Sequence, residues 1–243
     1  MVIIYGSATR LTDTTLSAAA SITVTGNYTN KNNITSGDIN GDGYLDLVFG
    51  NPDYSSISSA VVILGSSTGF PSSIDLSTDY DYIVSASTTN TTYAYAVSVG
   101  DIDGDGTDDV LVADQNASDY ASYAYTGSIY VYLGSASGLS SSPDHTITGV
   151  GDYDSLAPAI HVADLDNDGT DEFMAASGGD DTNDTNYGAV FGFDGSFSST
   201  MQTTDNSFAI FGESTWSYIG QYGFTIGDLD GDGSNDVVMS MPY

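Results

Sequence analysis

Aspartates in this sequence recur at a spacing that suits a metal cage. One nine-residue pattern, with Asp or Asn at positions 1, 3 and 5, Gly at position 6 and an acid at position 9, occurs four times. The copies start at Asp38, Asp101, Asp164 and Asp228, so they lie 63, 63 and 64 residues apart. Alternate side chains at positions 1, 3 and 5 point to one centre, and Gly at position 6 permits a sharp turn. Position 7 can add a backbone carbonyl, and the acid at position 9 closes the cage.

The chemistry of these loops is that of a hard cation. Carboxylate, amide and carbonyl oxygens suit Ca²⁺, which accepts about six to eight of them at roughly 2.3–2.6 Å, whereas Mg²⁺ dehydrates reluctantly. Soft transition metals are disfavoured because the chain has no cysteine and no clustered histidine. An EF-hand is excluded, because the Glu at position 12 and the flanking helices are missing. We expect about four Ca²⁺ ions, one per loop, in a structural role. The candidate ligands are Asp38, Asn40, Asp42, Tyr44, Asp46, Asp101, Asp103, Asp105, Thr107, Asp109, Asp164, Asp166, Asp168, Thr170, Glu172, Asp228, Asp230, Asp232, Ser234 and Asp236.

Short β-strands must position these loops. In each repeat an apolar or aromatic run ends in Gly, at residues 2–6, 60–65, 128–134 and 188–195. A second short strand follows each run, at 21–26, 81–85, 144–149 and 206–212, and two more strands flank each acidic loop, as at 95–100 and 110–113. No segment has a sustained helical period, and turn residues punctuate the chain every 8–12 residues or so. Four strands in about 60 residues predict one blade of a propeller.

The phase of the repeat predicts how a ring would close. The first two strands are the third and fourth of a blade, and the last two, at 224–227 and 237–241, are the first and second. We therefore expect one all-β domain over residues 1–243, a four-bladed β-propeller with four antiparallel strands per blade. The blades are expected at about 27–86, 87–149, 150–212, and 213–243 plus 1–26, so that strands from both termini close the fourth. The alternative is completion in trans by a neighbouring copy, which would build a swapped oligomer or a filament.

At the acidic loops the sequence resembles the FG-GAP repeats of integrin α-subunit propellers and of related surface proteins. The resemblance is carried by Gly37 to Pro52, Gly-Asp-Ile-Asn-Gly-Asp-Gly-Tyr-Leu-Asp-Leu-Val-Phe-Gly-Asn-Pro, and by its three partners. The resemblance implies that each acidic loop joins the first two strands of a blade and binds Ca²⁺. The integrin ring has seven blades, whereas this chain has four repeats, and the Phe-Gly and Gly-Ala-Pro signatures are degenerate here.

Composition narrows the partners and the chemistry. The chain has 2 Lys+Arg against 33 Asp+Glu, a formal net charge of −31. Such a charge excludes nucleic acid as a partner, and no apolar run is long enough for membrane insertion. There is no Gly-x-Ser-x-Gly elbow and no phosphate-binding loop, and His145 and His161 lie in different repeats. We therefore expect no enzymatic activity.

The expected role is that of a non-catalytic, calcium-stabilised module for structure or adhesion, located outside the cell or on its surface. Its partner would be a protein or glycan surface ligand, or copies of the chain itself, assembled into a surface polymer or filament. A lectin-like, carbohydrate-binding propeller is the alternative, with aromatic stacking platforms at Trp216, Tyr93, Tyr95, Tyr120, Tyr123 and Tyr125. Five Asn-x-Ser/Thr sequons fit a glycoprotein, at Asn27, Asn33, Asn90, Asn116 and Asn183.

Overall fold

The computed structural model describes residues 1–5, 21–26, 33–51, 58–86, 92–117, 125–180, 186–195 and 197–241. Within these residues the regular structure is eighteen β-strands and one short 3₁₀ helix, η1 (Thr203–Asp205). The chain is therefore all-β, as the sequence predicts. The strands are β1 (Val2–Ile3), β2 (Ile22–Thr25), β3 (Ile34–Gly37), β4 (Asp46–Asn51), β5 (Ser59–Ile63), β6 (Ser73–Asp75), β7 (Tyr82–Ser85), β8 (Tyr93–Gly100), β9 (Asp109–Asp114), β10 (Ser128–Tyr132), β11 (His145–Thr148), β12 (Leu156–Ala163), β13 (Glu172–Ser177), β14 (Ala189–Phe193), β15 (Thr200–Gln202), β16 (Phe208–Phe211), β17 (Phe224–Gly227) and β18 (Asp236–Met239).

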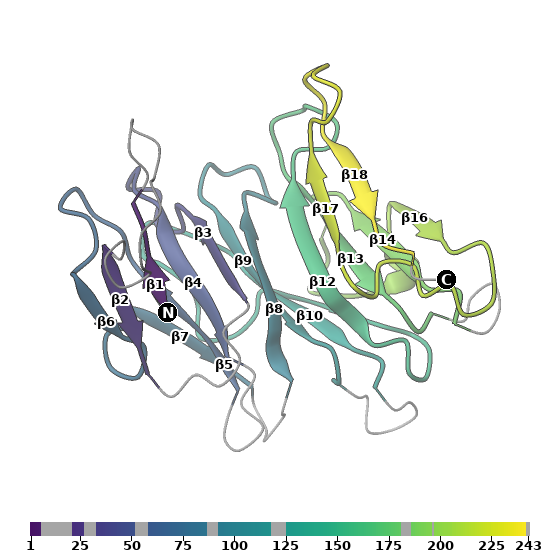
Figure 1. Ribbon diagram of the computed structural model, residues 1–243, viewed down its shortest axis with the longest axis horizontal. Coiled ribbons are helices and arrows are strands. Elements are labelled where there is room, and N and C mark those ends of the chain that lie inside the picture. Colours follow the sequence, from purple (N-terminus) through teal and green to yellow (C-terminus); the bar gives the residue numbers. More distant parts are fainter. Residues whose placement is uncertain are drawn as a thin grey trace, which may run out of the picture.

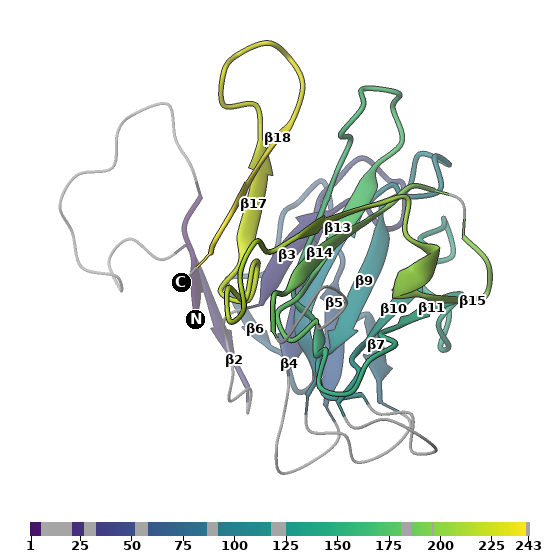
Figure 2. The same ribbon diagram turned by 90° about the vertical axis from the view of Figure 1, so that its right-hand side faces the viewer.

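Three sheets contain the four consecutive antiparallel strands expected of a blade. Their orders are β3-β4-β5-β7, β8-β9-β10-β11 and β12-β13-β14-β16. In each of them the second strand pairs with the third, as in Leu47 opposite Ile63 and Phe173 opposite Phe193. The acidic loop always joins the first strand to the second. Figures 1 and 2 show the loops between β12 and β13 and between β17 and β18 directed to the same end of the molecule.

The expected fourth blade is not a single sheet. β17 and β18 form a two-stranded sheet of their own, whereas β1 and β2 lie in a three-stranded sheet with β6. These two half-sheets lie toward opposite ends of the longest axis (Figure 1). Among the described residues, no strand pairing joins β1 or β2 to β17 or β18.

The prediction that strands of both termini close a fourth blade within the chain is therefore wrong for this structure. The described residues form five sheets and no closed ring, where four blades were expected. The repeat determines which strands a blade needs. Whether one chain supplies all of them depends on the rotation between successive sheets, which the strand pattern does not encode. The blade boundaries in the sequence stay a prediction.

Two short strands were not expected, and both link neighbouring sheets. β6 lies between the third and fourth strands of its repeat but pairs in parallel with β2, so that Ile74 lies opposite Val24. β15 does the same with β11, where Met201 lies opposite Ile147. Each strand therefore adds to the outer edge of the preceding sheet and fastens two repeats together.

The hydrophobic core is divided among the interfaces between successive sheets. Ile22 and Val24 of β2 pack with Phe49 of β4, and Val48 packs with Val110 of β9. A third cluster joins the sheet of β8–β11 to that of β12–β16, and a fourth joins β13 and β14 to β17 and β18. The five sheets therefore form a row with four apolar interfaces, and both faces of each inner sheet are covered.

Candidate metal centres

Each acidic loop is folded around its first aspartate. In the second loop, Asp101 Oδ1 accepts a hydrogen bond from the N–H of Asp105 at 3.0 Å, and Oδ2 accepts one from Gly106 at 2.9 Å. The same two contacts recur in the other three loops at 2.8–3.2 Å. The first aspartate therefore turns the backbone of its loop, which brings the later side chains back toward it.

Two positions of each loop have a left-handed backbone. Position 6 is Gly in every copy and has φ between 86° and 93°. Position 4 also has positive φ, with 67° at Gly41, 74° at Gly104, 61° at Asn167 and 79° at Gly231. Asn tolerates this conformation better than most residues with a side chain, which explains why it can replace Gly there. The repeat pattern predicts the first of these positions but not the second.

Carboxylates at positions 1, 3 and 9 come together in three of the loops. Each residue offers one oxygen, and within a loop these oxygens all lie within 4.8 Å of one another. Two oxygens bound to the same calcium at about 2.4 Å lie at most about 4.8 Å apart, so the spacing fits a shared hard cation. The three groups are Asp101, Asp103 and Asp109; Asp164, Asp166 and Glu172; and Asp228, Asp230 and Asp236.

The remaining candidate ligands lie close to these clusters but in different roles. In the first loop position 3 is Asn40, whose Oδ1 accepts from the N–H of Asp42 at 3.0 Å, as Asp103 does from Asp105 at 3.1 Å. The carboxylate at position 5 accepts the N–H of position 7 at 2.8–3.0 Å in all four loops. It lies outside the three clusters and closes a local turn. Coordination through the position 7 carbonyls, at Tyr44, Thr107, Thr170 and Ser234, stays a prediction.

The acid at position 9 connects the loop to the rest of its sheet. Asp109 is fully buried, and its Oδ2 accepts from the N–H of Ile102 at 3.0 Å while Oδ1 accepts from Gly134 at 2.8 Å. Asp46 makes the equivalent contacts with Ile39 and Gly65. These glycines end the apolar runs seen in the sequence, but their contact with the acid was not expected. The Gly at the end of each apolar run was the feature of the sequence that could have predicted this contact.

Burial and like charge act together on these carboxyl groups. Burial in the protein raises the pKa of Asp109 to about 7, the Asp103 and Asp101 charges add to the rise, and the hydrogen bond from Gly134 opposes it. Burial also raises the pKa of Asp46 and of Glu172. No lysine or arginine lies among the described residues to compensate. A divalent cation would supply the missing positive charge, so the donor set fits a hard metal ion.

In the second, third and fourth loops, position 8 joins the loop to the loop of the preceding sheet, a contact that the sequence pattern does not predict. Asp171 Oδ2 accepts from the N–H of Asp101 at 3.0 Å, and Asn235 Nδ2 donates to the carbonyl of Asp164 at 2.8 Å. The candidate cages are thus linked to one another by direct hydrogen bonds. The acids at position 8 were a visible signal, because the cage pattern had given them no role.

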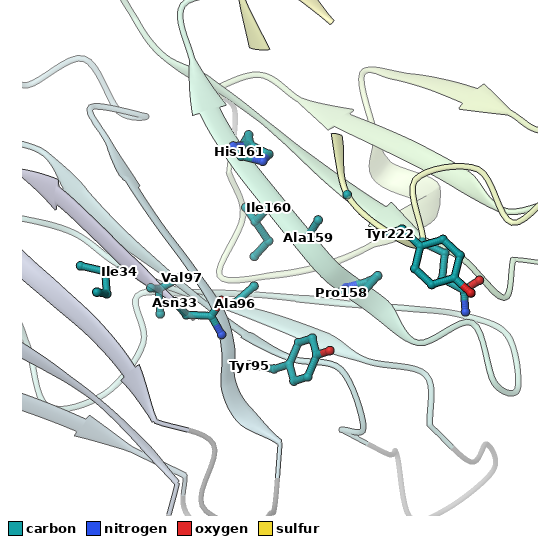
Figure 3. A pocket seen from close by; sticks show the side chains of 12 residues that line it. Asn33, Ile34, Tyr95, Ala96, Val97, Pro158, Ala159, Ile160, His161 and Tyr222 are labelled. Atoms are coloured by element: carbon teal, nitrogen blue, oxygen red, sulfur yellow. The ribbon is translucent and has the colours of Figure 1, made fainter. Parts of the chain in front are cut away.

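A separate hollow lies where the first strands of the repeats converge. It has a volume of about 460 Å³, and its lining residues come from β3, β8, β12 and the segments before β3 and β17. Figure 3 shows His161 at one end of the hollow and Tyr95 and Tyr222 toward the other. His161 packs edge-on against Phe224 with ring centroids 4.9 Å apart, and burial lowers the pKa of its imidazole.

The aromatic residues proposed as sugar platforms differ in exposure. Trp216 is 51% exposed and lies 6.0 Å from the Tyr218 ring, and Tyr125 is 47% exposed beside Tyr153. Tyr93 is buried, and its hydroxyl is hydrogen-bonded to that of Tyr132 at 2.6 Å, so it is no surface platform. Tyr120 and Tyr123 lie outside the described residues, as do the sequons at Asn27, Asn90 and Asn183.

The fold and the loops define a class: all-β proteins of repeated four-stranded antiparallel units, with an acidic loop on the first hairpin of each unit. The FG-GAP repeat family model matches residues 32–64 and 93–132. The chain therefore contains FG-GAP repeats, and the resemblance seen in the sequence is confirmed. The matched ranges include the first two acidic loops.

Known proteins share part of the chain. Phosphatidylinositol-glycan-specific phospholipase D of Mus musculus is 33% identical over 150 residues, which is 59% of this chain and 18% of the relative. The Bos taurus protein of that name is 32% identical over 151 residues, with the same coverage. The chain thus spans about a fifth of the length of these relatives. The structure of rhamnogalacturonan lyase YesW has a TM-score of 0.51 at 15% identity and covers 86% of this chain and 40% of the lyase chain, which is a likeness of fold.

The described residues contain no helix of the length and hydropathy needed to cross a membrane.

Proposed function

We propose that the chain is a non-catalytic, calcium-stabilised propeller module that acts in structure or adhesion outside the cell or on its surface. The observation that carries this proposal is the recurrence of one acidic loop on the first hairpin of every repeat. In three loops the cage gathers three acids within 4.8 Å. A solvent-exposed acidic turn would not have to recur at the same place in each repeat. A structural ion that stabilises the first hairpin of each repeat explains the recurrence.

Calcium is the ion that suits these ligands best. The donors are carboxylate and amide oxygens, which hard cations prefer, and the loops leave room for backbone carbonyls and water to complete about seven ligands. We expect one ion per loop and four in all, the fourth held by Asp38, Asn40 and Asp46 in the loop with an amide at position 3. Extracellular calcium reaches the millimolar range in which modules of this kind are loaded.

A structural role for these acids follows from their contacts. In the second loop, position 1 accepts two backbone N–H groups of its own loop, and position 9 accepts one from the loop and one from Gly134, which follows the third strand of its sheet. A carboxylate committed to backbone amides is poorly placed to move protons for a substrate. The relatives with enzyme names match over only 18% of their length, so their activities do not transfer to this chain.

Calcium binding is tested by titration of the metal-free protein, with binding heat and melting temperature as readouts. We expect saturable binding of about four ions and a higher melting temperature. Asp103→Ala should weaken one site, because it removes an oxygen ligand from a cage, and Asp103 is exposed. Glu213→Ala is the matched control, since Glu213 is an exposed acid outside every cage. Equal effects of the two substitutions, or no calcium-dependent melting, would exclude the proposal.

A carbohydrate-binding module is the second candidate, and the hollow favours it. Tyr222 is 72% exposed and lines the hollow together with Tyr95, so two aromatic rings lie where a sugar could stack. The test is a glycan array in calcium with the unmodified protein and with the double variant Tyr95→Ala and Tyr222→Ala. Glycan binding that the double variant loses would favour the lectin. An array without signal would exclude it.

A further inference from the structure

Each half-sheet at the end of the row lacks the strands that the other half-sheet contains. In the three complete sheets the second strand pairs with the third, as β4 with β5, β9 with β10 and β13 with β14. By its place in the repeat β18 is a second strand and β1 is a third strand. We propose that β18 of one chain pairs antiparallel with β1 of a second copy, so that two half-sheets form one four-stranded blade. This deepens the structural role proposed above, and rests on it.

Apolar side chains on the C-terminal half-sheet are exposed where their counterparts are covered. Val238 lies two residues after the position 9 acid and is 48% exposed, whereas its counterparts Val48, Leu111 and Met174 are fully buried beneath the next sheet. Leu229, at position 2 of its loop, is 67% exposed, whereas Ile39 and Ile102 are fully buried. Val238 and Leu229 are therefore apolar, as if a following sheet covered them, although the face on which they lie is exposed.

The N-terminal half-sheet has the complementary bare face. Ile4 lies two residues before the Gly that ends its run in the sequence and is 37% exposed. Its counterparts Ile63, Tyr132 and Phe193 are 5%, 2% and 1% exposed, because the preceding sheet covers them. The bare face at this end is thus the one that would receive a preceding sheet, and the bare face at the other end would receive a following one.

The complete sheets predict the register of the new pair. The residue after the position 9 acid lies opposite the residue two before the closing Gly in all three, as Leu47 with Ile63, Val110 with Tyr132 and Phe173 with Phe193. Applied to the half-sheets, this rule places Val237 opposite Ile4. Val238 then lies opposite Ile3, and Met239 lies opposite Val2.

The faces of the two half-sheets support this register independently. Val237 and Met239 pack toward the sheet of β12–β16, whereas Ile3 packs toward the sheet of β3–β7. Residues directly opposite each other on paired strands lie on the same face of the sheet. Val238 opposite Ile3 would therefore be covered by the sheet of β3–β7 of the second copy, against which Ile3 packs. A slip of one residue would place Val238 on the wrong face. Two different observations therefore agree on one register.

A second copy fits this edge better than the chain's own first strand. The two half-sheets lie apart along the longest axis in Figure 1, although both lie on the same side of the molecule in Figure 2, so pairing within the chain would require the sheets to close further around the hollow that their first strands line. Pairing between copies leaves the row as it is. The contact is head-to-tail, so the copies either close into a ring or extend into a filament.

Disulfide trapping tests the pairing, because the chain has no cysteine of its own. Two single variants, Ile4→Cys and Val237→Cys, are mixed in calcium and oxidised mildly. Opposite residues in an antiparallel pair have Cα separations of about 4.5–5.5 Å, which a disulfide can bridge. We expect a disulfide-linked product that contains one chain of each variant, identified by the peptide that joins positions 4 and 237, because each variant alone can also oxidise to a symmetric dimer of the same mass. The link can form only between copies, since each chain carries one of the two cysteines.

The matched control moves one cysteine by one residue. Ile4→Cys mixed with Val238→Cys places the thiols on opposite faces, so we expect about tenfold less product. Random collision would give the reverse order, because Val238 is more exposed than Val237 in the isolated chain. Equal yields from the two mixtures would therefore overturn the proposal. A second outcome would also overturn it. If the double variant Ile4→Cys and Val237→Cys forms an intrachain disulfide while the two single variants form no link, the blade closes within one chain.

The mass of the unmodified protein provides a second measurement that needs no variant. Light scattering in calcium should show a species of two or more chains at micromolar concentration, and Val238→Lys should shift it toward one chain. Tyr153→Lys is the control, because Tyr153 is 62% exposed in the segment between β11 and β12, which belong to inner sheets. A single chain at every concentration would overturn the pairing. Calcium-dependent melting in the same samples reports on the proposed function separately, so either idea can fail alone.

Discussion

The carboxylate of Asp108 accepts a hydrogen bond of 2.6 Å from the backbone N–H of Asp38, which lies 70 residues earlier in the chain. The N–H of Asp108 also donates to the carbonyl of Asp38 at 3.0 Å. Two acidic loops on neighbouring sheets are thereby joined backbone to backbone. The residue before Asp38 has to be glycine, because a Cβ at Gly37 would lie 2.5 Å from the Asp108 carboxylate.

Asp108→Ala should destabilise the protein without changing the ligands of either cage. The substitution leaves the partly buried N–H of Asp38 without its acceptor, at a cost of about 1–3 kcal/mol in the free energy of unfolding. Denaturant unfolding in calcium measures this. Glu213→Ala serves as the control and should cost less than about 0.5 kcal/mol. A free energy of unfolding that is the same for Asp108→Ala as for the unmodified protein would mean that the contact between loops contributes nothing.

Gly134→Ala should be more harmful than Gly106→Ala, although Gly106 has the less usual backbone conformation. A Cβ at Gly134 would lie 2.3 Å from the carbonyl oxygen of Asp108 and 2.8 Å from that of Ile39, both backbone atoms that cannot move aside easily. A Cβ at Gly106 meets nothing within 4 Å and suffers only from φ of +89°, a strain of about 1–2 kcal/mol. Thermal unfolding of the two variants should rank them in this order, and the opposite ranking would contradict the packing between the loops.

Removal of calcium should lower the stability by an amount that depends on the concentration of free ion. A site held at about one hundred times its Kd contributes about 2.7 kcal/mol. For a chain of this size each kcal/mol corresponds to about 2–4 °C in Tm. We therefore expect a fall of several degrees per emptied site when a chelator is added, and recovery when calcium is restored. Magnesium at the same concentration is the control and should recover less.

In chelator, the stability should depend on pH through Asp109. Its pKa is about 7 in the folded protein, above the ordinary value of 3.8. A raised carboxyl pKa favours the protonated folded state, so this contribution is complete below about pH 4 and is lost as the pH rises through 7. The metal-free protein should therefore melt at a higher temperature at pH 5 than at pH 8.

In calcium the trend with pH should reverse, because the ion needs the ionised carboxylate. Asp109→Asn removes the titrating group and should flatten the metal-free profile between pH 5 and 8. Its effect is read against Asp103→Asn, a more exposed member of the same cage. A profile that keeps its slope in the Asp109 variant would show that the slope originates elsewhere.

Much of this fold was predictable, because the repeat shows every strand more than once. The run from Ala60 to Gly65 and the run from Ser128 to Gly134 were both expected to be third strands, and β5 and β10 lie there. The acids at positions 1, 3 and 9 were expected to converge because loop spacing alone brings their side chains together. In three loops they do so.

The features that escaped prediction depend on contacts between repeats. The parallel strand β6 pairs with β2, which lies about 50 residues earlier, and no local pattern marks it. The hydrogen bond from the N–H of Asp38 to the carboxylate of Asp108 depends on how one sheet lies against the next. Closure of the fourth blade failed for the same reason, since repeat counting cannot determine the rotation between sheets.

The division of the core into interfaces between neighbouring sheets has a consequence for how the molecule opens. Stability in such an array is a sum of units and nearest-neighbour terms, so a unit with one neighbour opens more readily than a unit with two. The sheet of β8–β11 has an apolar cluster on each face, whereas the β17–β18 hairpin has one on a single face. Amide hydrogens should accordingly exchange with solvent soonest in the terminal half-sheets and last in β9 and β10, in a graded sequence along the row.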